Sequence, residues 1–175
     1  YIGNTIDDSK MSLANIRDEI ESNKRLRSDF GLMIDIKKFE FREKWSSEQL
    51  TIGKCTIIAK SRGQKIRGSK FGQSRIDLII GDDLEDVKDA DTPEKRKKTR
   101  IWFFSEVLPA TKQGILADNV KVVLIGNLVH KDCLLAHLGK GDIVKTLKFA
   151  IIDEDGNITW PGMYPNMDAI NAEKE

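Results

Sequence analysis

A nearly continuous apolar run, VKVVLIGN at residues 120–127, constrains the fold more than any other stretch of this chain. Its β-branched residues favour a strand, and a strand without alternating polar residues is typical of a parallel sheet that is covered on both faces. A second apolar segment, Ile76–Ile80, leads through Gly81 into acidic residues. Helical patterns separate the strands along the chain, so the sequence predicts an α/β layer fold.

A first helix is predicted over residues 8–26, because Leu13, Ile16 and Ile20 fall on one helical face. Asn23 is a point where this helix should weaken, and Phe30-Gly31 should end it. Three polar residues are candidate N-caps: Asp7, Asp8 and Ser9.

A second helix should open at Thr92-Pro93, which supplies a capping hydroxyl and a proline at the first helical position. Pro109 should close it. A short third helix is predicted over residues 131–138, before Gly139. The expected apolar face of the second helix comprises Ile101, Phe104, Val107 and Leu108.

Shorter strands complete the predicted architecture. YIGNT, at residues 1–5, should be a strand that ends in a loop, and residues 50–59 should form two strands around a turn at Gly53-Lys54. A hairpin is expected around Asp155-Gly156, whereas residues 31–47 are predicted to be irregular. Three glycines punctuate a loop before the acidic strand end: Gly63, Gly68 and Gly72.

Charge and cysteine content narrow the class of protein only slightly. The chain has 29 basic and 28 acidic residues, so its net charge of +1 argues neither for nor against nucleic acid. The sequence has no run of about 18 apolar residues, so no transmembrane helix is predicted. Cys55 and Cys133 lie far apart and lack the spacing of a zinc site, which is typical of reduced thiols in a cytoplasmic protein.

Acidic residues follow the apolar segment that ends at Ile80: Asp82, Asp83, Glu85 and Asp86. Ligands of open α/β sheets sit beyond the carboxyl ends of the strands. One carboxylate there can hold Mg²⁺, and the next can orient a water for attack on a phosphate, which is the arrangement of a Walker B element. An ordinary solvated strand end or a helix-cap cluster is the alternative.

Several motifs follow one another along the chain: R-x-DLII-x-DDLED, an EKR helix start, WFFSEVLPA, the strand VVLIGN followed by HKDCLL, and a terminal DG…WP. In this order and spacing they resemble the ATPase domain of the large terminase subunit of tailed bacteriophages. The resemblance covers residues 1–165 and implies part of a RecA-like (ASCE) P-loop NTPase sheet, mainly parallel, with a small β-hairpin insertion. Residues 166–175 should be a frayed tail.

The resemblance also implies roles for individual residues. Asp82 would hold the Mg²⁺ that accompanies ATP, and Asp83 would position the attacking water, with Glu85 as a rival for that role. Asn127 lies in what looks like the family's coupling motif, which senses the γ-phosphate, although relatives commonly have a hydroxyl residue there. Arg67, on the glycine-rich loop, is a candidate for contact with phosphate or DNA.

The implied enzyme is an ATP hydrolase that drives double-stranded DNA into a procapsid in the host cytoplasm. Its implied partners are a portal protein and a small terminase subunit, and its working form is a ring-shaped homo-oligomer. No membrane is involved. The chain departs from the family because it contains no G-x-x-x-x-G-K-[ST] phosphate loop and no nuclease domain. Together with the abrupt start at YIGNT, this predicts a fragment that by itself binds ATP poorly or not at all.

Two other functions are compatible with the residues. A metal-dependent nuclease would use the acidic cluster as its metal site. A non-catalytic module would grip nucleic acid through the glycine loop and the basic run Lys95–Arg100, for which a solvated helix face is the plainer account. His130 and Asp132 are expected to be structural, because no further metal ligand lies at a suitable spacing.

Overall fold

The fold was analysed in a computed structural model of the chain. The structure describes residues 1–31, 46–52, 55–68, 76–110, 121–141 and 144–172. It divides into two compact units, Tyr1–Lys140 and Gly141–Glu175. Most of the segment predicted to be irregular, and the turn at Gly53-Lys54, lie outside the described residues.

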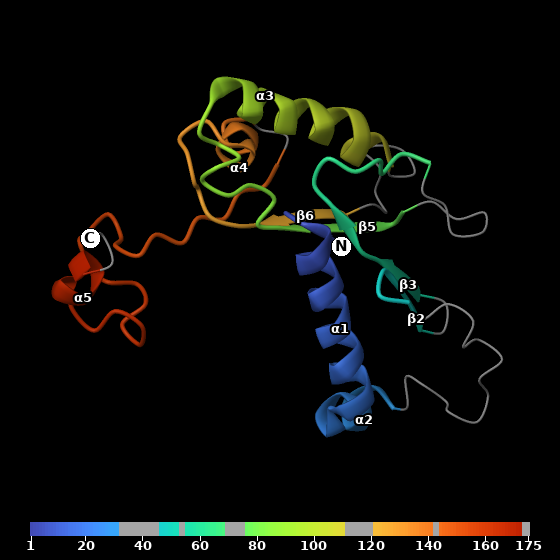
Figure 1. Ribbon diagram of the computed structural model, residues 1–175. Coiled ribbons are helices and arrows are strands. Elements are labelled where there is room, and N and C mark those ends of the chain that lie inside the picture. Colours follow the sequence, from blue (N-terminus) through green and yellow to red (C-terminus); the bar gives the residue numbers. More distant parts are fainter. Residues whose placement is uncertain (32–45, 53–54, 69–75, 111–120, 142–143, 173–175) are drawn as a thin grey trace. The chain divides into compact units, whose positions relative to one another are not determined.

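A four-stranded, all-parallel sheet forms the centre of the first unit, with the strand order β4-β1-β5-β6 (Figure 1). The strands are β1 (Ile2–Gly3), β4 (Lys60–Ser61), β5 (Leu78–Asp82) and β6 (Lys121–Ile125). Strands β2 (Gln49–Ile52) and β3 (Cys55–Ile58) form a separate antiparallel hairpin. The predicted α/β class, with a parallel sheet and a small hairpin, is therefore confirmed.

Helices lie on both sides of this sheet (Figure 1). One side carries α3 (Pro93–Trp102), the π-helical η2 (Phe103–Val107), the 3₁₀ turn η3 (Leu108–Ala110) and α4 (Leu134–Leu138). The other side carries α1 (Ile6–Ser22), which is followed by α2 (Lys24–Phe30). The main core lies on the α3 side and consists of Ile2, Ile66, Ile79, Leu84, Trp102, Phe103, Val107, Ala110 and Leu134.

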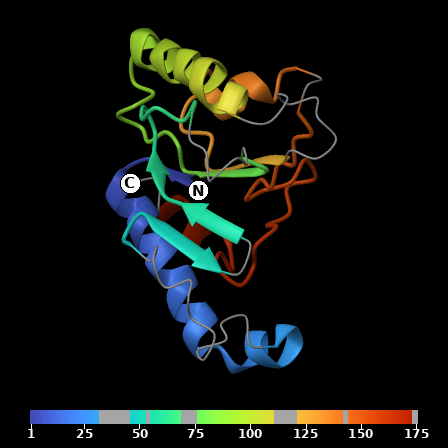
Figure 2. The same ribbon diagram turned by 90° about the vertical axis from the view of Figure 1, so that its right-hand side faces the viewer.

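Helix α1 packs its apolar face against the β2–β3 hairpin (Figure 2). Buried Leu13 contacts the cluster of Leu50 and Ala59, and Ile16 and Ile20 pack around it. The face predicted from the sequence is therefore correct. Burial of this apolar face, more than helix propensity, stabilises such a helix.

The start of α1 corrects the predicted caps. Thr5, and none of the three candidates, is the N-cap: its hydroxyl accepts from Asp8 N at 3.2 Å, and Asp8 Oδ2 accepts from Thr5 N at 3.1 Å. This reciprocal capping box extends the helix towards β1. Asn23 ends α1 and caps α2 by accepting from Arg25 N, as the expected weak point suggested.

Helix α3 begins as predicted, with Thr92 accepting from Lys95 N and Pro93 at the first turn. Its predicted apolar face is correct in part: Val107 is buried and Leu108 packs against the core, whereas Ile101 and Phe104 are 56% and 43% exposed. Trp102 and Phe103 supply the other buried apolar side chains. In η2 the Leu108 N–H donates to Phe103 O, five residues earlier, and this wider turn rotates the following side chains relative to an α-helical pattern.

Strand β6 is an edge strand among the described residues, and its alternating exposure corrects the expected burial of the run 120–127 on both faces. Val122 and Leu124 pack towards the main core, whereas Val123 and Ile125 are 43% and 56% exposed. Helix α1 contacts β1 and β4 and does not cover this part of the sheet. Strand β5 also begins two residues later than predicted and extends to Asp82.

The second unit contains the predicted hairpin turn and a short helix. Ile152 and Ile158 form an antiparallel bridge, and Asp153 N donates to Asn157 O at 2.9 Å around Gly156, whose φ is 86°. Helix α5 (Met167–Ala172) occupies most of the region predicted to be a frayed tail. None of the helices in the described ranges is long and apolar enough to cross a bilayer.

Buried Ser9 joins α1 to two strands. Its hydroxyl accepts from Gly3 N at 2.8 Å and donates to Lys60 O at 2.6 Å. A Cβ at position 3 would lie 2.8 Å from Ser9 Oγ, so glycine is what allows this close approach. The hydroxyl therefore satisfies polar backbone atoms of both β1 and β4 at the place where α1 leaves the sheet.

We expect Ser9→Ala to lower the free energy of unfolding by about 1–3 kcal/mol, because the buried Gly3 N–H loses its acceptor. Ser22→Ala makes the same chemical change on the exposed end of α1, where the hydroxyl donates to Asp18 O, and should change stability by less than about 0.5 kcal/mol. Urea unfolding followed by circular dichroism measures both. Equal effects of the two substitutions would contradict the assigned role of Ser9.

Candidate functional site

The carboxyl ends of the parallel strands meet at one edge of the sheet and bring polar residues from distant segments together. Asn4 follows β1, Arg62 follows β4, Asp83 follows β5 and Gly126-Asn127 follows β6. Asp82 is in register with Ile125, and Asp83 N then donates to Ile125 O at 3.0 Å. The acidic end of β5 therefore lies at the carboxyl edge of the sheet, where α/β proteins commonly bind ligands.

Asp82, the residue expected to hold Mg²⁺, is half-buried on the side of the sheet that faces α1. Its Oδ2 accepts from the Tyr1 hydroxyl at 2.7 Å, and Ser12 Oγ donates to that hydroxyl at 3.1 Å. Burial, reinforced by the Asp82 carboxylate, raises the pKa of Tyr1, so the phenol stays a donor at neutral pH. No residue in the described ranges bonds the second oxygen, Oδ1, of Asp82.

Asp83, the expected water-positioning acid, is exposed and turns away from the strand. Its φ is 41°, and within the described ranges it is the sole non-glycine residue with a positive φ. Its Oδ1 lies 3.0 Å from the place that a Cβ would take at Gly126, where φ is 156°. The glycine at the end of β6 thus permits the close approach of the Asp83 carboxylate.

Glu85, the rival for the water-positioning role, lies inside the protein and is only 9% exposed. Its Oε2 accepts from Leu134 N at the start of α4, while its buried Oε1 has no hydrogen-bond partner within the described structure. Burial raises the pKa of Glu85, and the hydrogen bond from Leu134 opposes that shift. The Glu85 carboxyl group is therefore held towards α4, in contrast to the exposed carboxyl group of Asp83.

A small hollow lies between the acidic strand end and α4. Three of the predicted site residues, Asp83, Glu85 and Asn127, line it; Asp82 and Arg67 do not. The remaining lining residues are Leu84, Leu124, Ile125, Gly126, Leu134 and Leu135. The structure therefore unites the two candidate acids with the predicted coupling residue, and it places Asp82 on the adjoining side of β5.

Arg67 belongs to a different surface. Its backbone N, like that of Ile66, donates to Glu106 Oε2 at 3.2 Å, and its side chain is exposed. Trp102 Nε1 holds the same loop by donating to Gln64 O at 2.8 Å. The loop is thus fixed against α3 and η2, and Arg67 stands outside the hollow.

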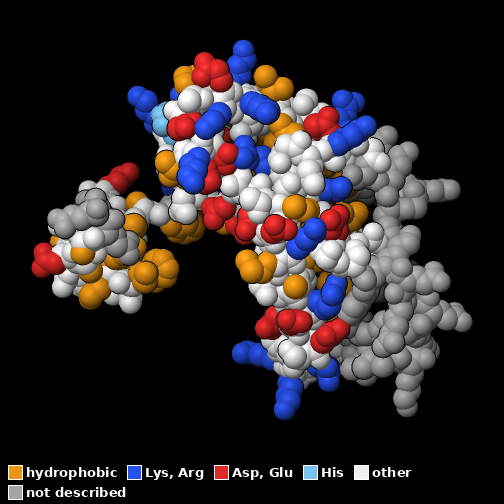
Figure 3. All heavy atoms as spheres, viewed as in Figure 1, with side chains coloured by type: hydrophobic (Ala, Val, Ile, Leu, Met, Phe, Trp, Pro, Cys, Tyr) orange, Lys and Arg blue, Asp and Glu red, His pale blue; other side chains and the backbone are white. Residues whose placement is uncertain are grey.

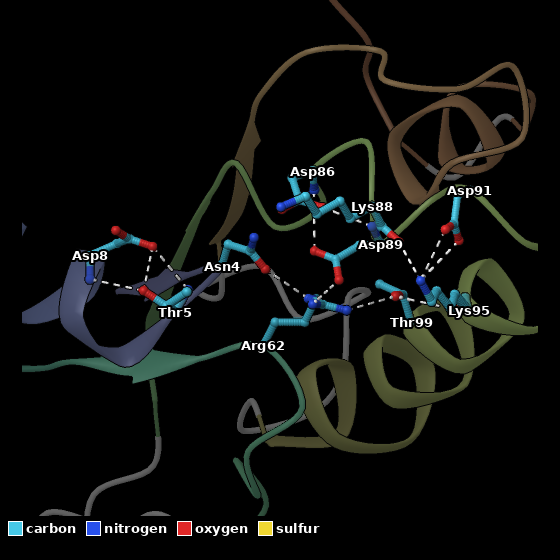
Figure 4. Close-up of polar contacts among 10 residues, drawn as sticks. All are labelled: Asn4, Thr5, Asp8, Arg62, Asp86, Lys88, Asp89, Asp91, Lys95 and Thr99. Atoms are coloured by element: carbon cyan, nitrogen blue, oxygen red, sulfur yellow. Dashed lines mark hydrogen bonds and ion pairs between the residues drawn. The ribbon is translucent and has the colours of Figure 1, made fainter.

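Arg62 organises the loop that follows the acidic strand end (Figure 4). Its guanidinium forms an ion pair with Asp89 and donates to Asn4 Oδ1 at 3.0 Å and to Thr99 Oγ1 at 3.5 Å. Asp89 is in turn tied to Asp86, whose Oδ1 accepts from Asp89 N at 2.8 Å. The role of Arg62 was not predictable from the sequence, because an ion pair between residues 27 positions apart leaves no local spacing signal.

The acidic residues do not form a cluster of metal ligands by themselves. Within the described ranges, no three His, Cys, Asp or Glu side chains converge on a point where they could hold a metal ion. The nuclease alternative needs such a cluster, and Asp86, one of its members, is bonded within its own loop. Asp82, whose Oδ1 has no partner among the described residues, does fit Mg²⁺, which is commonly bound by one or two carboxylates, water and substrate phosphates.

The basic run on α3 is largely used within the molecule. Lys95 bonds Lys88 O and Asp91, and Arg96 and Arg100 both contact Asp132. Lys97 and Lys98 are exposed, and basic and acidic side chains are interspersed over the α3 region (Figure 3). This surface gives little support to a nucleic-acid patch at Lys95–Arg100.

The expected structural role of His130 agrees with its contacts. His130 Nδ1 accepts from Asp132 N at 3.0 Å, which closes the turn before α4. Asp132 then faces the arginines of α3, and the hydrogen bond from Arg100 lowers the pKa of its carboxyl group. The pair therefore fixes α4 beside α3.

Comparisons with protein-family models, with curated proteins and with solved structures give no match for this chain.

Removal of the Arg62 guanidinium should destabilise the first unit. We expect Arg62→Ala to lower the free energy of unfolding by about 2–3 kcal/mol, because Asp89 is left without its partner at only 19% side-chain exposure. Lys10→Ala, which removes a more exposed ion pair with Glu48, is the control and should cost clearly less. Urea unfolding tests this, and equal losses for both variants would contradict it.

Glu85 should make stability depend on pH. Because burial raises its pKa in the folded state, the native protein binds more protons than the unfolded chain above about pH 4.5. The protonated Glu85 side chain contributes its full share to the free energy of unfolding at pH values below its pKa in the unfolded chain. That contribution is lost as the pH rises through the pKa of Glu85 in the folded protein. The stability of Glu85→Gln relative to wild type should therefore rise across this window and then level off. Urea midpoints from pH 4 to 8 measure it; a pH-independent difference would contradict the raised pKa.

Proposed function

We propose that this chain is part of the ATPase of a viral DNA-packaging motor, of the large terminase subunit class. Such a motor couples Mg-ATP hydrolysis to translocation of double-stranded DNA into a procapsid. The observation that carries the proposal is the shared hollow of Asp83 and Asn127 at the carboxyl ends of neighbouring parallel strands, with Asp82 at the last position of β5. The order of the sequence motifs supports the same conclusion.

The residues divide the work according to their exposure. Asp82 has an oxygen available for Mg²⁺, which would neutralise charge on the phosphates of ATP. Asp83 is the exposed acid and would orient the attacking water, and Asn127 would hydrogen-bond the terminal phosphate. Arg67 lies on a separate surface and would contact phosphate or DNA from there.

The proposal assigns hydrolysis to an assembly that includes a phosphate loop, since these 175 residues contain no G-x-x-x-x-G-K-[ST] motif. The arrangement β1-β5-β6, with parallel strands ending at the acidic edge, is compatible with part of a RecA-like sheet. Portal, small terminase subunit and ring assembly follow from the same proposal. No contact in the described structure favours the nuclease or the non-catalytic binding module over it.

Substitutions in the intact ATPase test the assignment. We expect Asp82→Asn to abolish Mg²⁺-dependent hydrolysis, and Asp83→Asn to lower kcat by at least about 100-fold while Mg-ATP still binds. Asp91→Asn, which removes an exposed acid of the same loop that pairs with Lys95, is the control and should retain activity. Phosphate release and nucleotide binding are measured in parallel. Near-normal hydrolysis by Asp82→Asn would exclude Asp82 as the metal carboxylate.

A further inference from the structure

We infer that Glu85 is a positioning residue that ties α4 to the acidic strand end and so holds the Gly126-Asn127 segment against Asp83. The inference rests in part on the proposed function, because it concerns the same hollow. It gives the two acids that line the hollow different roles, because Asp83 is exposed and Glu85 is buried. Glu85 therefore acts through other residues.

The first contact is the hydrogen bond that crosses from the acidic loop to α4. Glu85 Oε2 accepts from Leu134 N, a backbone group 49 residues away in the chain. Leu134 is buried in the main core at 1% exposure. As the first residue of α4, it has a backbone N–H for which the helix itself provides no acceptor. The N-cap residue, Cys133, makes no side-chain capping bond, so Glu85 supplies the missing acceptor.

The next contact carries this position to the end of β6. Leu135 follows Leu134 on α4, and its Cδ1 lies 3.3 Å from where a Cβ would stand on Gly126. On the other side, Asp83 Oδ1 lies 3.0 Å from the same point. Gly126 therefore lies between Leu135 of α4 and Asp83, with no room for a side chain, and the position of α4 bears on the glycine that precedes Asn127.

One oxygen of Glu85 lowers the free energy of unfolding instead of raising it. Its Oε1 is buried without a hydrogen-bond partner in the described structure, and an unsatisfied buried oxygen opposes folding. An apolar residue of similar size would avoid that cost but could not accept from Leu134 N. The carboxylate is thus explained by what it holds in place and not by its own contribution to stability.

Amide hydrogen exchange on the 175-residue chain tests the tether without reference to ATP. Glu85→Gln keeps an acceptor for Leu134 N, whereas Glu85→Met removes it at similar volume. We expect the Leu134 amide to exchange about tenfold faster in Glu85→Met and at a near wild-type rate in Glu85→Gln, relative to the buried Leu13 amide as an internal reference. Unchanged Leu134 exchange in Glu85→Met, or equal acceleration in both variants, would overturn the inference.

Kinetics of the intact ATPase separate positioning from direct catalysis. A positioning role predicts that Glu85→Met lowers kcat by about 10–100-fold with little change in KM, and that Glu85→Gln keeps activity within a few-fold of wild type. If Glu85 itself oriented the water, Glu85→Gln would be as inactive as Glu85→Met, which would overturn the inference. An intact protein without any ATPase activity would refute the proposed function, while the exchange experiment would still decide the tether.

Discussion

Parallel pairing between β5 and β6 determines where the acidic residues of this chain can act. The register sets Asp82 opposite Ile125, and the next hydrogen bond joins Asp83 N to Ile125 O. Because side chains alternate between the faces of a strand, a slip of one residue would move Asp82 to the core side and bury a carboxylate among apolar groups. Packing of Ile79, Val122 and Leu124 in the main core therefore fixes the site as well as the fold.

Arg62 and Glu85, two charged residues near this edge, differ in how completely their polar atoms are hydrogen-bonded. Arg62 is matched by Asp89 and by two neutral acceptors, so its guanidinium binds four segments of the chain together. Glu85 has one hydrogen bond for two oxygens. A polar network in which every group is hydrogen-bonded makes a structure more rigid, whereas a buried group with an unpaired oxygen lowers the free energy of unfolding. Such a group needs an explanation other than stability. This contrast is why Arg62 is assigned to folding and Glu85 to positioning.

The sequence predicted those features that depend on local pattern. The Thr92-Pro93 start of α3, the apolar face of α1 and the parallel acidic strand were all encoded by short-range spacing. Three features needed the folded chain. Trp102 and Phe103 are buried in place of Ile101 and Phe104, an ion pair spans 27 residues, and the buried Glu85 is bonded to the start of α4. Each depends on contacts between distant segments, which a single sequence does not display.

The candidate site was predicted to the level of the sheet edge, but the orientation of its acids was not. Consecutive strand residues point to opposite faces, so a regular strand would send the Asp83 side chain straight to the face opposite Asp82. The positive φ of Asp83 breaks this alternation: Asp82 stays on the α1 side, and the Asp83 carboxylate lies beside Gly126 at the end of β6.

The choice of aspartate at position 83 follows from this turn. A left-handed backbone costs most L-residues roughly 1–2 kcal/mol, and aspartate is among the few whose short polar side chain tolerates it. A glutamate there would carry the same charge one methylene further from the backbone and with less local hydrogen bonding to offset the strain. The residue type at position 83 is therefore selected by backbone conformation as well as by charge, and this ties the proposed chemistry of the acid to the geometry that ends β5.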